Sequence, residues 1–155
     1  MRTPLRGVRT VGDRTLTLLR SGPTPDGRLR VLCVDDEEDI RVILEMSLVL
    51  DADIAVEVVA EGATLLQLAA TGDYDVILLD AMMPGMDGYE VCRRLKANEA
   101  TAHIPVIFLT AKTQRDEIER ARALGAIDCL KKPFDPMTIS RELRATLATA
   151  LQLAS

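Results

Sequence analysis

Apolar runs of strand length alternate with segments of helical period from Arg28 onward. The expected strands are Leu29 to Val34, Ala55 to Val59, Val76 to Leu79, Val106 to Leu109 and Ala126 to Leu130. These runs are short and mostly unalternating, as expected of parallel strands that are covered on both faces. The pattern therefore predicts an α/β fold with a doubly wound, five-stranded parallel sheet.

One helix is expected in each connection between strands, with its apolar residues on a single face. The predicted faces carry Ile40, Ile43, Leu44 and Leu48, then Leu65, Leu68 and Ala69, then Val91 and Leu95, then Ile118 and Ala121. A last helix, entered after Pro136, carries Ile139, Leu143, Leu147, Ala150 and Leu151. Five helices and five strands fill the chain and leave no room for a second domain.

The charge distribution separates the first 27 residues from the rest. They carry five Arg against two Asp, whereas residues 28–155 carry 14 basic and 22 acidic side chains. Glycine and proline are frequent in the first segment, so we interpret residues 1–27 as an Arg-rich tail or linker and residues 28–155 as the folded domain. The tail also resembles a transit peptide or a regulatory arm, and a short added strand or hairpin is the next alternative.

Composition narrows the classes of function. The acidic domain should repel nucleic acid, and with 3% aromatic residues and no Trp it lacks a platform for stacking bases. No run reaches the roughly 18 apolar residues of a membrane helix, so no membrane contact is expected. Cys33, Cys92 and Cys129 show no pairing or metal-ligand spacing, which favours a reducing, cytoplasmic location.

Chemically active side chains follow four of the five predicted strands. Asp35 and Asp36 follow the first strand, Asp80 the third, Thr110 the fourth and Lys132 the fifth. Singly, these residues could cap helices or open turns. Jointly they lie at the edge of a doubly wound sheet where ligands bind.

Three carboxylates at one edge repel each other by roughly 3 kcal/mol for a pair about 5 Å apart at an effective dielectric near 20. A hard divalent cation removes this penalty, and carboxylate oxygens with phosphate oxygens suit Mg²⁺. The sequence therefore predicts an Mg²⁺-assisted phosphate site, with Asp35, Asp36 and Asp80 as metal ligands. The backbone carbonyl of Met82, in the turn-rich loop after the third strand, is a further candidate ligand.

Asp80 is the predicted nucleophile, because a carboxylate can carry a phosphoryl group as an acyl phosphate once nearby cations neutralise the transferring oxygens. Lys132 is expected to pair with the phosphoryl oxygens, and Thr110 to donate a hydrogen bond to one of them. The Lys132–Pro133 peptide bond is a candidate for the cis form.

Four segments together resemble the receiver domain of bacterial two-component response regulators. They are VLCVDDE (31–37), LLDAMMPGMDG (78–88), PVIFLTA (105–111) and KKPF (131–134). Their order and spacing agree as well, with 44 positions from Asp36 to Asp80, 30 more to Thr110 and 22 more to Lys132. The resemblance covers about residues 28–150.

This resemblance implies a flavodoxin-like (βα)5 fold and a phosphoprotein of phosphorelay signal transduction. Asp80 would receive a phosphoryl group from a histidine kinase or a histidine phosphotransfer protein. Mg²⁺ would be held by Asp36, Asp80 and the Met82 carbonyl, with Asp35 acting mostly through water. Such a protein is not an enzyme beyond its own phosphorylation and dephosphorylation.

The resemblance also implies a partner for the output. No effector domain follows Ser155, so we expect a stand-alone receiver that signals through a downstream effector protein. The face of the fourth helix, fifth strand and fifth helix is the family's usual partner surface and a possible homodimer contact. It includes Arg115, Glu119, Arg122, Arg141 and Arg144, which could equally form a solvated face.

Two positions bear on how the site would work. The family has an aromatic residue three positions before the signature lysine, where this chain has Cys129, so another residue must report the phosphorylation state. His103, the single histidine, precedes Ile104 and Pro105 at the start of a strand and is expected to be a surface residue rather than a phosphodonor.

Two alternative functions stay open. A phosphohydrolase of the haloacid dehalogenase type needs an acid two residues after its nucleophile. That position is Met82 if the nucleophile is Asp80, and Glu38 if it is Asp36. A degenerate receiver acting only as a binding module is the other alternative, although all five signature side chains are present.

Overall fold

The computed structural model describes residues 27–111 and 114–154, in which strands and helices alternate strictly. The strands are β1 (Leu29–Val34), β2 (Ile54–Val59), β3 (Val76–Asp80), β4 (Val106–Thr110) and β5 (Asp128–Lys131). The helices are α1 (Glu38–Val49), α2 (Gly62–Thr71), α3 (Gly88–Ala97), α4 (Arg115–Ala123) and α5 (Ile139–Ala154). Each connection between strands thus contains one helix, as the sequence predicts.

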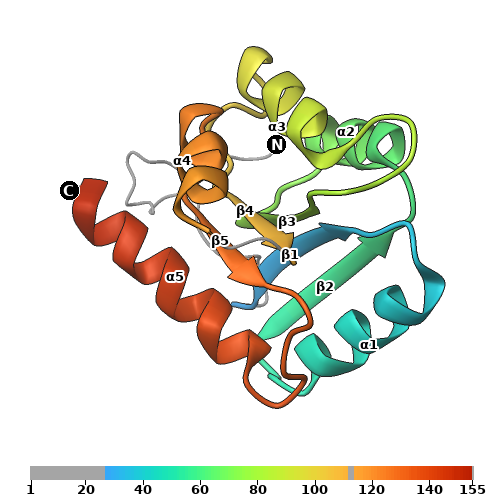
Figure 1. The fold of residues 1–155 in the computed structure, drawn as a ribbon. Helices are drawn as coiled ribbons and strands as arrows, with labels where there is room; N and C mark the ends of the chain where they lie inside the picture. The colour runs from blue at the N-terminus through green and yellow to red at the C-terminus, as the bar shows by residue number, and fades with distance from the viewer. Residues whose placement is uncertain (1–26, 112–113, 155) are drawn as a thin grey trace.

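All five strands are parallel and form one sheet in the order β2-β1-β3-β4-β5 (Figure 1). The chain leaves β1 toward one edge of the sheet and returns to build the other edge from β3 onward. The predicted doubly wound fold is confirmed. Its switch point lies between β1 and β3, where the carboxyl ends of two adjacent strands leave room for a site.

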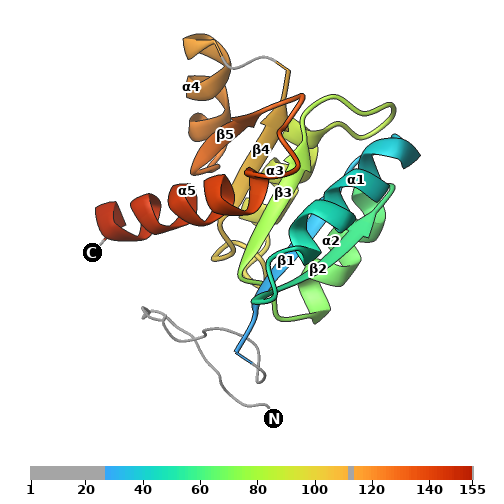
Figure 2. The same ribbon diagram turned by 90° about the horizontal axis from the view of Figure 1, so that it is seen from below.

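Helices α1 and α5 lie on one face of the sheet, and α2 and α3 on the other (Figure 2). Each face carries its own apolar core. Alternate residues of each strand point to opposite cores, so Val31 and Cys33 pack with α1 and α5 while Leu32 and Val34 pack with α2 and α3. Burial on both faces explains why the central strands β3 and β4 are apolar up to their last residues.

The helical faces are largely as predicted, with two exceptions. Leu44, Leu48, Ile139 and Leu143 are buried, but the side chains of Ile43 and Leu151 are 39% and 45% exposed. Tyr89 and Cys92 of α3 and Ser47 of α1 are buried although the predicted faces left them out. The Ser47 hydroxyl donates to the Ile43 carbonyl oxygen at 2.6 Å. Because that bond satisfies its polar atom, a small serine can take a core position of α1.

Side chains tie the ends of some elements to their neighbours. The Asp87 carboxylate caps α3 by accepting a hydrogen bond from the Glu90 backbone N–H at 2.9 Å. Arg144 of α5 donates to both carboxylate oxygens of Asp51, at 2.7 and 3.3 Å, and so joins α5 to the turn after α1.

The predicted N-terminal tail, residues 1–27, lies outside the described residues except for Gly27. Among the helices that the structure describes, none combines the length and the apolar character needed to cross a membrane.

Candidate functional site

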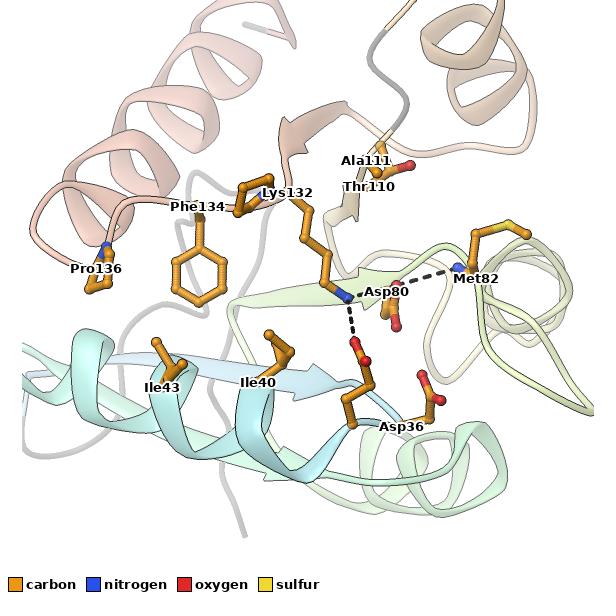
Figure 3. A pocket seen from close by; sticks show the side chains of 12 residues that line it. Asp36, Ile40, Ile43, Asp80, Met82, Thr110, Ala111, Lys132, Phe134 and Pro136 are labelled. Atoms are coloured by element: carbon orange, nitrogen blue, oxygen red, sulfur yellow. Dashed lines mark hydrogen bonds and ion pairs between the residues drawn. The ribbon is translucent and has the colours of Figure 1, made fainter.

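The predicted site residues meet at the carboxyl edge of the sheet. Asp35 and Asp36 follow β1 directly, and Asp80 is the last residue of β3, the neighbouring strand. One ligand oxygen from each of these three carboxylates lies within 4.8 Å of the other two. Lys132 approaches them from the end of β5 across β4 (Figure 3).

Asp80 lies in a buried, polar environment. Asp80 is 4% exposed, and its Oδ1 accepts a hydrogen bond from the backbone N–H of Met82 at 3.3 Å. Its other oxygen, Oδ2, is fully buried and has no hydrogen-bond partner among the described residues. Burial, followed by the charge of Asp35, raises the pKa of Asp80 from 3.8 to about 6, although Lys132 opposes the shift.

Lys132 is the cation of the site. Its Nζ donates to Asp35 Oδ2 at 2.8 Å and lies 3.4 Å from Asp80 Oδ1 and 3.8 Å from Glu37 Oε1. Burial alone would lower the pKa of Lys132, but the hydrogen bond to Asp35 and the charges of both aspartates outweigh it and raise that pKa. The ammonium group therefore stays protonated. The Lys132–Pro133 bond is cis, as the sequence suggested.

The two acids after β1 have different surroundings. Asp35 is fully buried, with Oδ1 accepting the Glu37 backbone N–H at 2.9 Å and Oδ2 bound to Lys132. Asp36 is exposed to solvent and faces the same cavity as Asp80. The buried acid is thus neutralised within the chain, whereas the exposed acid stays open to a ligand.

The donor set fits a hard divalent cation. Three carboxylates repel one another, one lysine does not balance them, and the buried Oδ2 of Asp80 lacks a donor. Oxygen ligands of this kind, with water in the remaining positions, suit Mg²⁺. For Met82 the structure gives a backbone N–H directed at Asp80, and the predicted role of its carbonyl as a ligand stays a prediction.

The loop after Asp80 approaches the strand end closely because of Gly88. A Cβ at this position would overlap the carbonyl oxygen of Asp80 and lie 2.9 Å from Ala81 Cα. The Gly88 N–H donates to the Ala81 carbonyl oxygen at 3.1 Å, which closes the loop. Gly85, at the tip, has a φ of +74°, a conformation that favours glycine.

A cavity of about 650 Å³ opens over Asp80 (Figure 3). Asp36, Glu37, Asp80, Met82, Thr110 and Lys132 form its polar side, and Ile40, Ile43, Ala111, Pro133, Phe134 and Pro136 form its apolar side. Thr110 is buried at the end of β4 and is brought to the cavity as predicted. The volume of the cavity is typical of a ligand site and is large enough for a phosphoryl group and a metal ion.

Sequence reasoning missed the apolar wall of the cavity and Glu37. Ile40 and Ile43 of α1 point toward Phe134 and Pro136 of the loop between β5 and α5 (Figure 3). The helical period placed Ile43 in the core, and only the packing of α1 beside that loop shows that it lines the cavity instead. Phe134 was visible as part of the KKPF segment, but its role was not.

The structure also shows the surroundings of the cysteines and of the single histidine. The three cysteines are free, and burial raises the pKa of the half-buried Cys129 to about 11, so its thiol is protonated. His103 is exposed, as expected.

The predicted partner face, on α4, β5 and α5, already uses several of its charges within the chain. Arg115 pairs with Glu119 at 3.3 Å, Arg122 with Asp128 at 3.4 Å, and Arg144 binds Asp51.

Comparisons with known proteins agree with this geometry. The model of the response regulator receiver domain family matches residues 31–144. Response regulator PleD of Caulobacter vibrioides is 41% identical over 116 residues, which are 75% of this chain and 25% of PleD. The chain spans between a quarter and about half of the length of the curated relatives it matches.

Solved receiver structures share the fold. The chemotaxis protein CheY4 of Vibrio cholerae has a TM-score of 0.71 and 32% identity, covering 77% of this chain and 98% of that chain. A beryllofluoride-activated DrrB receiver domain has a TM-score of 0.65 and 26% identity, covering 78% of this chain and 98% of that one.

Proposed function

The chain belongs to the response regulator receiver domain family, and from this premise we propose that it is a signalling switch phosphorylated on Asp80. The single observation that carries the proposal is the state of Asp80 Oδ2. This oxygen is buried and has no hydrogen-bond donor among the described residues. The other oxygen of the same carboxylate, Oδ1, lies 3.4 Å from Lys132 Nζ, and the carboxylates of Asp35 and Asp36 are close by. A carboxylate in this environment can accept a phosphoryl group together with a metal ion, because both would interact with the oxygen that now lacks a partner.

Phosphoryl transfer to Asp80 needs little from the protein beyond position and charge. An oxygen of Asp80 forms the new O–P bond while the N–P bond of a donor phosphohistidine breaks, and the electron pair leaves with the imidazole nitrogen. The Lys132 ammonium group, 3.4 Å from Asp80 Oδ1, would pair with the transferred oxygens. The hydroxyl of Thr110, at the end of β4, would donate a hydrogen bond to one of the phosphoryl oxygens.

Bound Mg²⁺ would supply a positive charge that offsets the negative charge of the transferring group. Asp36 and Asp80 would hold the metal directly with the Met82 carbonyl, and Asp35 mostly through water. The bond of Asp35 to Lys132 agrees with this division, because it occupies Oδ2 of the buried acid and leaves the exposed Asp36 available.

The partner that donates the phosphoryl group would be a histidine kinase or a histidine phosphotransfer protein. Its approach is supported by an exposed apolar surface on α1, made of Val42, Ile43, Met46, Val49 and Leu50, whose exposed fractions range from 39% to 66%. Ile43 also lines the cavity over Asp80, so this surface continues into the site. We propose that a helix of the donor packs on the α1 surface and presents its histidine to Asp80.

A matched pair of variants tests this docking. Met46→Glu places a charge in the α1 surface, whereas Leu151→Glu places one on the exposed part of α5. Transfer from the phosphorylated kinase should fall at least tenfold in Met46→Glu alone, while labelling by a small acyl phosphate stays unchanged in both. Equal transfer to both variants would contradict the docking proposal.

The domain and its output complete the proposal. Residues 28–155 would form the receiver domain, working in the cytoplasm and signalling through a changed contact with a downstream effector protein. A homodimer through α4, β5 and α5 is a further proposal. Of the residues on that face, Arg115, Arg122 and Arg144 would first have to exchange their present partners.

The test is incubation with Mg²⁺ and a small acyl phosphate, followed by intact-mass analysis of the wild type and Asp80→Asn. One phosphoryl group should appear on the wild type alone. Turnover of many phosphate esters without an adduct would favour the haloacid dehalogenase alternative. Neither an adduct nor metal binding would favour a degenerate receiver.

A further inference from the structure

Tyr89 of α3 connects three elements of the molecule. It is 9% exposed, and its ring packs on that of Phe108 in β4 with centroids 5.1 Å apart and planes tilted by 34°. Its hydroxyl donates to Glu117 Oε2 at 2.8 Å, and the guanidinium carbon of Arg120 lies 3.8 Å from its ring centroid. Glu117 and Arg120 are one turn apart on α4, so a single side chain contacts both.

The same side chain is linked to the phosphorylation site through β4. Phe108 and Thr110 are two positions apart, so their side chains leave the strand on the same face. Cys129 is the register partner of Phe108 on β5 and packs against the same core as Tyr89. A movement of Thr110 toward a phosphoryl group would therefore change the packing around Phe108, which Tyr89 contacts.

The position of α4 depends on few apolar contacts. Within α4, which the structure describes in full, Ala121 is the buried residue and Ile118 is half-buried. Such a helix is held weakly by packing, so the hydrogen bond and the cation–π contact with Tyr89 weigh heavily in its placement. Burial and then the Glu117 bond raise the pKa of Tyr89 to about 12, which keeps the hydroxyl a donor at ordinary pH.

We propose that Tyr89 is the residue that reports the state of the site to α4, with its contacts to Glu117 and Arg120 holding α4 in the unphosphorylated arrangement. Phosphorylation of Asp80 shifts Thr110 and Phe108, and the Tyr89 contacts to α4 then break. This inference rests on the proposed function and adds to it the path from Asp80 to α4. It also explains how the chain can signal with Cys129 in place of an aromatic residue.

If the contacts of Tyr89 with Glu117 and Arg120 exist only in the unphosphorylated state, they are thermodynamically coupled to phosphorylation. Weakening them must then favour the phosphorylated state and raise the affinity for a phosphoryl mimic. Beryllofluoride with Mg²⁺ is a suitable mimic, since it activates the related DrrB receiver. The measured quantity is the dissociation constant of beryllofluoride, followed by NMR shifts of backbone amides in β3 and β4.

The chain offers a closely matched control in Tyr74. Its hydroxyl donates to Glu57 Oε1 at 2.8 Å, and Arg30 lies 4.9 Å from its ring centroid, so its surroundings resemble those of Tyr89. Tyr74 precedes β3 at the amino end of the sheet, away from the site. Tyr74→Phe therefore removes an equivalent bond without touching the proposed path.

Tyr89→Phe should bind beryllofluoride about fivefold more tightly than the wild type, the lower end of typical allosteric coupling. Tyr74→Phe should match the wild type. Glu117→Gln, which keeps the tyrosine and weakens the same bond, should change the affinity in the direction of Tyr89→Phe and serves if that variant does not fold.

Unchanged or weaker binding in Tyr89→Phe and Glu117→Gln would overturn the role of Tyr89 while leaving the phosphoacceptor function intact. An equal gain in Tyr74→Phe would overturn it as well, because the effect would then reflect general loosening. Failure of the wild type to bind beryllofluoride at all would instead contradict the proposed function.

Discussion

Removing the charge of Asp80 should stabilise the metal-free protein at neutral pH. Asp80→Asn keeps the size of the side chain but takes one carboxylate away from Asp35 and Asp36, whose oxygens lie within 4.8 Å. In the wild type, burial and Asp35 raise the pKa of Asp80 from 3.8 to about 6. A shift of about two units corresponds to about 3 kcal/mol of native-state stability.

The sign of the pH dependence follows from the direction of the shift. Below pH 3.8 Asp80 is protonated in both the folded and the unfolded state, and the wild type carries no penalty. As the pH rises to about 6, the Asp80 carboxyl ionises in the unfolded state before it ionises in the folded state, so the wild type loses stability relative to Asp80→Asn. The advantage of the variant is complete above that pH and disappears in acid.

Urea unfolding of both proteins in EDTA, at pH 7.5 and pH 4, measures this difference. A gain of about 3 kcal/mol corresponds to roughly 10 °C in Tm for a domain of this size. Asp36→Asn is the control, because Asp36 is exposed and its removal should matter less. A less stable Asp80→Asn at pH 7.5, or an advantage that persists at pH 4, would refute the account of a strained, buried carboxylate.

Four further substitutions test the surroundings of the site. Gly88→Ala should lower the free energy of unfolding, measured in urea, by at least about 2 kcal/mol, because the new Cβ would overlap a carbonyl oxygen of β3. Gly85→Ala has open space around the new Cβ but a positive φ, so it should lower the free energy of unfolding by roughly 1 kcal/mol. Arg144→Ala breaks a half-exposed bond to Asp51 and should cost below about 1 kcal/mol by urea titration, with labelling by acyl phosphate unchanged. Lys132→Ala should slow that labelling roughly 100-fold on a phosphate-affinity gel while Mg²⁺ binding is kept; an undiminished rate would contradict its role.

The sheet and its order of elements were predictable because burial on both faces leaves a direct mark on the sequence. Val31 to Val34 and Val76 to Leu79 are continuously apolar since alternate residues enter different cores. Helical faces were less certain, because periodicity does not say which neighbour a face meets. Ile43 has the spacing of a core residue but borders the cavity and the α1 surface.

The acidic and basic side chains of the site were predictable from their places at strand ends, which parallel topology brings to one edge. The inequality between Asp35 and Asp36 was not, because it depends on which carboxylate Lys132 reaches. Tyr89 was missed for a similar reason. Its contacts to Phe108 and Glu117 join residues 19 and 28 positions away, and no local pattern marks them.

The most direct test of the central claim is chemical mapping of the phosphorylated residue. The protein is incubated with Mg²⁺ and a small acyl phosphate, reduced with borohydride, which converts an aspartyl phosphate to homoserine, and analysed by peptide mass spectrometry. The account predicts homoserine at position 80 in the wild type and none when Mg²⁺ is withheld. Homoserine at another aspartate, or unmodified Asp80 beside a phosphorylated residue elsewhere, would contradict it.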